Sequence, residues 1–152
     1  MPTVAQRRRD LRNLPWRLVR QVLRIARQAY WSQPRPTGTY LRVETDPHPI
    51  TKALGERFWY PNWEVSAYYE GEDLNLSRTE YDPHEGIVWW QSHLRGWETD
   101  DAVELRAHYE PDPTEHPREH LTPAYADAET GMTHLRDALD DAGFSYREFE
   151  YR

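Results

Sequence analysis

The chain contains no cysteine, which excludes disulfide bonds and thiolate metal ligands. Lysine is almost absent as well, because Lys52 is the only lysine among nineteen basic residues. No apolar run approaches the ~20 residues of a membrane-spanning helix. The seven glycines are isolated, so neither a phosphate-binding loop nor a dinucleotide-binding motif is present. These absences predict a protein of the reducing cytoplasm that is not in a membrane and carries no cofactor.

What the chain has in excess is acid and aromatic surface. Its 152 residues correspond to one domain, with a formal net charge of −7 and an aromatic fraction of 13% that can supply core volume. An acid-rich, lysine-poor composition resembles that of proteins from extremely halophilic archaea. A high genomic GC content is an alternative cause, because it also favours arginine over lysine.

The positive charge is concentrated at the start. Residues 1–31 hold eight arginines against one acid, Asp10, so the remainder of the chain sums to −14. The pair Arg8-Arg9 resembles a twin-arginine export signal. Such a signal needs an apolar segment after the pair, and here further arginines interrupt that segment. We therefore divide the chain into a basic arm, residues 1–12, and a single domain, residues 13–152.

Hydrophobic periodicity predicts an α+β fold. A four-strand antiparallel meander with flanking strands is expected, covered by an N-terminal amphipathic helix and a C-terminal helix. Helices are predicted at about 14–31, 50–58 and 130–142, and strands at about 39–45, 63–69, 74–81, 87–97, 103–109 and 144–151. Residues 111–128 contain four prolines and few aliphatic residues, which is typical of a long surface loop.

The first helix has an arginine ridge opposite its apolar side. Guanidinium groups bind carboxylates and phosphates in a bidentate manner. We expect a non-catalytic interaction module in which this ridge docks an acidic protein surface, on a partner or on a second copy. The alternative is a nucleic-acid-associated protein, which the −14 remainder and the salt sensitivity of phosphate contacts disfavour. The arginines predicted to make this contact are Arg7, Arg8, Arg9, Arg17, Arg20, Arg24 and Arg27.

A second alternative is a small metal-dependent hydrolase. His116, Glu119 and His120 match the H-x-x-E-H pattern, in which two histidines bind zinc and the glutamate activates water. Pro117 stands inside the motif, so at most one helical turn is available. A solvated loop with mixed charges is the competing interpretation.

Two further histidines fall on adjacent predicted strands. His93 and His108 are expected to be cross-strand neighbours, and Glu104 or Glu110 could join them in an acid/base pair. Hydrogen-bonded surface histidines are the plainer interpretation.

Adjacent aromatic residues on a strand point to opposite faces. One member of each pair, Trp89-Trp90 and Tyr68-Tyr69, must therefore be covered by a helix or be exposed. Exposed Trp90 and Tyr68 would mark an interface, because aromatic residues are enriched at binding hot spots.

Overall fold

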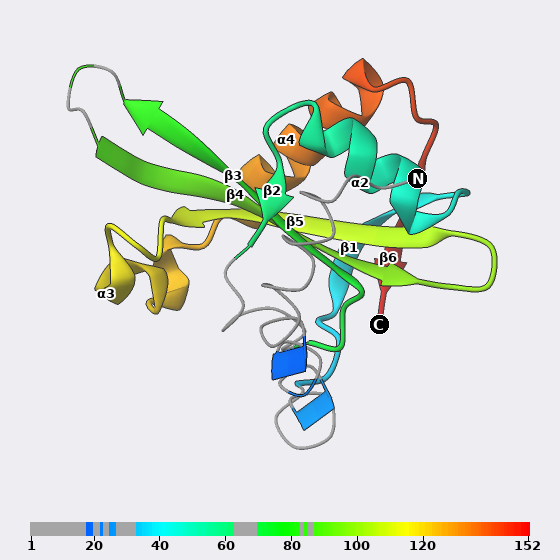
Figure 1. Cartoon of the computed structure of the whole chain (residues 1–152), viewed down its shortest axis with the longest axis horizontal. Coiled ribbons are helices and arrows are strands. Elements are labelled where there is room, and N and C mark those ends of the chain that lie inside the picture. Colours follow the sequence, from blue (N-terminus) through cyan, green and yellow to red (C-terminus); the bar gives the residue numbers. More distant parts are fainter. Residues whose placement is uncertain are drawn as a thin grey trace, which may run out of the picture.

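The computed structural model describes residues 18, 19, 22, 25, 26, 33–62, 70–82, 84 and 87–152. Six strands and three α-helices follow one another along the described ranges (Figure 1). They are β1 (Gly38–Val43), α2 (Pro47–Gly55), β2 (Tyr60–Pro61), β3 (Leu74–Asp82), β4 (Ile87–Glu98), β5 (Val103–Pro111), α3 (Pro117–His120), α4 (Ala128–Asp141) and β6 (Arg147–Tyr151). A short 3₁₀ turn, Pro123–Tyr125, separates α3 from α4.

The six strands form one antiparallel sheet in the order β2-β3-β4-β5-β1-β6. This confirms an α+β fold built mainly on an antiparallel sheet, with β3, β4 and β5 as the predicted meander. Strand β1 does not extend the meander in chain order, because it lies between β5 and β6. The strand predicted at 63–69 lies outside the described residues.

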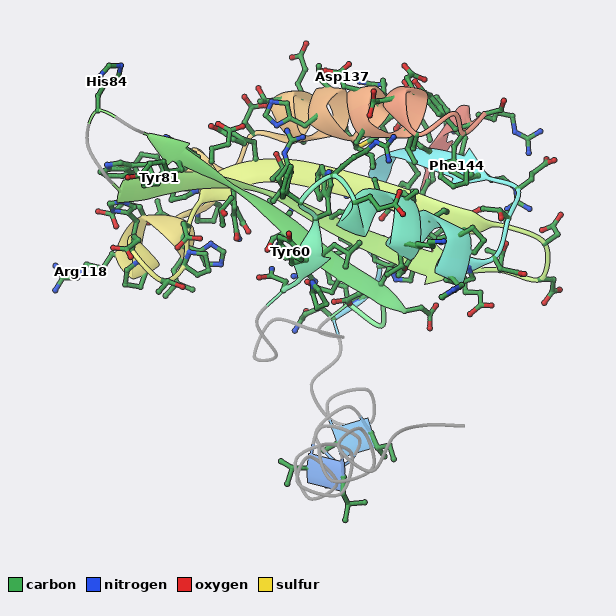
Figure 2. The ribbon with its side chains drawn as sticks, turned by 45° about the horizontal axis from the view of Figure 1, so that its top comes forward. Tyr60, Tyr81, His84, Arg118, Asp137 and Phe144 are labelled. Atoms are coloured by element: carbon green, nitrogen blue, oxygen red, sulfur yellow. The ribbon has the colours of Figure 1, made fainter. Side chains whose placement is uncertain are left out.

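One face of the sheet, here the apolar face, is covered by α2 and α4, which lie on the same side of the strands (Figures 1 and 2). Alternate positions of each strand point to this face, and the residues that form its core are aliphatic. The core of this face comprises Leu41, Val43, Leu74, Leu76, Leu94, Val103, Leu105 and Ala107 from strands, with Ile50, Leu54, Met132, Leu135, Ala138 and Leu139 from helices.

Helix α4 approaches strand β5 unusually closely. A Cβ atom on Gly131 would lie only 2.2–2.5 Å from backbone atoms of His108. The helix begins after Asp127, whose side chain accepts a hydrogen bond from the backbone N–H of Thr130. Gly131 therefore lets α4 pack against β5 at the level of His108.

The opposite face, here the polar face, has buried residues of a different kind. Gln91 and His93 of β4 and Glu110 of β5 are all buried there. Towards β1 and β6 the same face becomes aromatic. There the Arg35 guanidinium lies 4.3 Å from the ring centroids of both Tyr40 and Tyr151.

The predicted N-terminal helix falls largely outside the described residues. Those of its residues that are described, including Leu18 and Ile25, are helical, and their large apolar side chains are exposed. The expectation that these side chains cover the sheet is therefore wrong for the described positions, and α2 takes that place beside α4. Among the described helices, none is long and apolar enough to span a bilayer.

Candidate functional site

Two histidines and a glutamate meet on the polar face. His93 of β4 and His108 of β5 are paired across the strands, which confirms the predicted neighbourhood. Their ring centroids are 5.0 Å apart. Glu110 follows His108 by two residues, so strand alternation puts it on the same face.

The carboxylate of Glu110 is the centre of this group. Its Oε1 atom lies 3.0 Å from Nδ1 of His93 and accepts a hydrogen bond from Nε2 of Gln91 at 2.9 Å. Its Oε2 atom lies 2.7 Å from Nε2 of His108. The ligand atoms of the two histidines and Glu110 all lie within 4.8 Å of one another, which is close enough to share one ion.

This group is largely withdrawn from water. His93 is 2% exposed and Glu110 is 6% exposed. Burial lowers the pKa of His93 to about 4, because the imidazolium ion would lose its hydration. Burial alone would raise the pKa of Glu110, but the interactions of its carboxylate with His108 and His93 outweigh it and lower that pKa below its usual range.

A chain of hydrogen bonds behind His93 fixes which of its nitrogens carries the proton. The fully buried carboxylate of Glu72 accepts from Nδ2 of Asn75 at 2.8 Å and from the backbone N–H of Glu70 at 2.9 Å. The Asn75 amide therefore presents its NH₂ group to Glu72. Its Oδ1 atom then faces Nε2 of His93 at 2.9 Å, and this nitrogen must donate.

The neutral ring of His93 consequently has its lone pair on Nδ1, the atom that faces Glu110. A lone pair and a carboxylate oxygen at 3.0 Å repel each other unless a positive centre lies between them. A positive centre here is either a proton, which makes an imidazolium–carboxylate pair, or a metal cation that moves the two atoms slightly apart.

The loop after β5 brings further histidines towards the same face. The ring of His116 stacks on Trp89 with centroids 3.3 Å apart. Nδ1 of His120 donates to the backbone carbonyl of Pro111 at 2.9 Å and lies 3.6 Å from Oε1 of Glu110. The helix of the H-x-x-E-H motif has only four residues, Pro117–His120, as the prolines predicted.

The motif residues themselves do not converge on one point. His116 contacts a tryptophan and His120 approaches Glu110, while the group of donors that could share an ion consists of His93, His108 and Glu110. Glu104, which the sequence offered as an alternative partner of the strand histidines, instead binds Arg35 and Arg42.

A second group, close to α4, has the residue types of a hydrolase triad. Oγ of Ser92 lies 2.6 Å from Nδ1 of His134, and Oε1 of Glu80 lies 3.9 Å from the same nitrogen. In a triad the serine and the acid bind different ring nitrogens, and the serine is accessible. Ser92 is 0% exposed, and Tyr109 donates to the other oxygen of Glu80. This group is therefore a structural link across the sheet.

The other predicted binding residues are only partly described. Trp90 is half-buried and stacks on Tyr109, with ring centroids 5.0 Å apart. Tyr68 and the seven arginines predicted to dock a partner lie outside the described residues, so docking through them stays a prediction.

Sequence reasoning missed Asn75, Gln91 and Glu72, which orient the histidine–glutamate group. A signal was present, because Asn75 and Gln91 occupy alternate strand positions on the face of His93. No known protein family, curated protein or solved structure matches the chain, so the role of the group has to follow from its own chemistry.

Proposed function

We propose that this chain is a metal-binding protein that holds one divalent transition-metal ion, with zinc as the reference ion. The ligands are Nδ1 of His93, Nε2 of His108 and the carboxylate of Glu110. The observation that supports the proposal most directly is the pair of facing acceptors, Nδ1 of His93 and Oε1 of Glu110, 3.0 Å apart.

The spacing of the donor atoms supports a shared ion. Zinc binds imidazole nitrogen and carboxylate oxygen at about 2.0–2.2 Å, so neighbouring ligand atoms of a tetrahedral ion stand about 3.3–3.6 Å apart. The two nitrogen–oxygen distances here are 3.0 and 2.7 Å, so the two histidine rings have to move outward by a few tenths of an ångström to accommodate an ion. Imidazole and carboxylate together suit zinc, iron and nickel better than calcium or magnesium.

The surroundings of the ligands support it as well. In metal sites the second nitrogen of a ligand histidine usually donates to an oxygen, which fixes the tautomer and the ring orientation. Here Nε2 of His93 donates to Oδ1 of Asn75, and Gln91 holds the carboxylate of Glu110 by donating a hydrogen bond to Oε1. A buried polar group of this kind costs stability unless its hydrogen bonds are complete.

The test is a zinc titration of the full chain after purification in chelator. We expect one zinc per chain and, at a hundredfold excess over the dissociation constant, about 2.7 kcal/mol of added stability, which raises the melting temperature by about 5–10 °C. Glu110→Gln, which keeps the shape but removes the charge, should abolish both effects. His48→Gln is the matched control, because His48 is exposed on α2.

Two outcomes separate the metal from a proton. Stoichiometric binding that is lost in Glu110→Gln and kept in His48→Gln supports the metal site. If neither zinc nor cobalt binds and the melting temperature is indifferent to both, a proton joins His93 to Glu110 and the proposed function is wrong.

A further inference from the structure

Helix α3 is attached to the sheet in an unusual way. It is four residues long, and none of its residues is buried. The contacts that hold this segment against the polar face are made by histidines at its two ends, His116 on Trp89 and His120 on Pro111. The segment thus lacks the apolar anchor that fixes α2 and α4.

His120 reaches the edge of the metal-ligand group. Its Nδ1 atom lies 3.6 Å from Oε1 of Glu110, the same oxygen that faces His93. Two ligands of one tetrahedral zinc ion stand about 3.4 Å apart, so this spacing fits a pair of ligands. It is longer than a hydrogen bond, and the nitrogen meanwhile donates to the carbonyl of Pro111.

We propose that His120 is the fourth ligand of the ion, so that the metal ties α3 to strands β4 and β5. This inference rests on the proposed function. On binding, His120 changes tautomer: the proton leaves Nδ1, which gives up its hydrogen bond to Pro111 and binds the ion, and Nε2 takes up a proton from water. The ring has to move inward, because the group of donors already close together comprises His93, His108 and Glu110.

The consequence is a closed site. Zinc held by four protein ligands is structural, whereas a catalytic zinc keeps one position for water or substrate. The ion would then serve to order the segment after β5, residues 112–126. Its binding free energy would replace the apolar contacts that α3 lacks.

The two histidines of the H-x-x-E-H motif consequently have different roles. His120 binds the ion, and His116 anchors the start of α3 on Trp89. Nε2 of His116 is buried and has no hydrogen-bond partner in the structure, so stacking on the ring is its main contact. Glu119 is not part of the site and activates no water.

The experiment is cobalt substitution of the full chain, read by its visible absorption. Four-coordinate tetrahedral cobalt absorbs far more strongly than five- or six-coordinate cobalt. We expect the strong tetrahedral bands in the wild-type chain. In His120→Gln we expect weaker bands and an affinity lower by at least about tenfold.

Two variants serve as controls. Glu119→Gln changes the neighbouring residue on α3 and should leave the spectrum and the affinity unchanged. His116→Phe keeps a ring on Trp89 and should do the same. Since His120 is not in the core, its variant should fold, and the circular dichroism spectrum of the metal-free chain checks this.

The possible results are distinct. Strong bands in the wild type that weaken only in His120→Gln support the fourth ligand. Identical spectra and affinities for the wild type and His120→Gln overturn this inference, while the three-ligand site stands. A wild-type chain that binds neither cobalt nor zinc removes both the site and its fourth ligand.

Discussion

The two faces of the sheet are both buried, yet by opposite means. Leu94 and His93 are adjacent on β4 and are 0% and 2% exposed. Leu94 enters an aliphatic core under two helices, while His93 enters a network of amide, carboxylate and imidazole groups. Exposure alone therefore does not distinguish packing from chemistry, and the partners of each side chain do.

The difference matters energetically. An aliphatic side chain gains about 1.5–3 kcal/mol from burial, whereas a buried polar group costs free energy unless its hydrogen bonds are satisfied. Replacing a buried polar network by apolar residues is often neutral or stabilising. The buried groups of the polar face thus contribute little to the free energy of unfolding. This favours a binding role for the polar face and a packing role for the apolar face.

The largest effect is expected where the two faces meet through the backbone of β5. In Gly131→Ala the new methyl group would overlap backbone atoms of His108, which cannot move aside as a side chain could. We expect α4 to separate from the sheet, with a loss at or above the about 1–3 kcal/mol typical of overpacked cores. Urea denaturation measures it.

The matched control is Gly55→Ala at the end of α2. A Cβ at Gly55 meets nothing within 4 Å, so this change should be neutral or stabilise by about 0.5–1 kcal/mol. Equal stabilities of the two variants would show that α4 does not lie as close to β5 as described.

The apolar face can be weakened by Leu94→Ala. We expect a loss of about 2–5 kcal/mol, because the surrounding core residues cannot fill the cavity. Zinc affinity should remain that of the wild type at a temperature where the variant is folded, since the side chain points away from His93. Isothermal titration measures the affinity, and a parallel loss of binding would mean that the two faces are not independent.

The polar face can be changed without a cavity by Gln91→Glu. The second carboxylate would lie about where Nε2 now donates to Glu110, so two negative charges would share a buried site. We expect the metal-free chain to lose about 1–3 kcal/mol through the broken hydrogen bond. Zinc should restore part of it, so the melting temperature of this variant should rise more on zinc addition than that of the wild type.

The features that depend on local sequence pattern could be predicted. The alternation of apolar and polar residues predicted β3, β4 and β5, and therefore the pairing of His93 with His108 and the proximity of Glu110. The 3.6-residue period gave α4. These features follow from the positions of apolar residues along one segment.

What depends on contacts between distant segments could not be predicted. The place of β1 between β5 and β6 is set by pairing across more than sixty residues, and no local pattern encodes it. The same holds for His120, whose approach to Glu110 depends on the turn after Pro111. Reading H-x-x-E-H as one site failed because its two histidines lie over different strand residues.

The smallest effect is expected at the start of α4, away from the polar face. Hydrogen bonds from the Thr130 hydroxyl and backbone N–H to the Asp127 carboxylate lower the pKa of Asp127 from its ordinary value. Because the folded-state pKa is depressed, the stabilisation is complete above about pH 4 and is lost as the pH falls through the folded-state value.

Asp127→Asn keeps a capping side chain but cannot titrate. The wild type should therefore lose stability relative to the variant as the pH falls below about 4, while zinc affinity at pH 7 stays the same in both. A pH-independent difference between the two melting curves would show that the carboxylate does not cap the helix, and a change in zinc affinity would show that the apolar side of the molecule reaches the polar face after all.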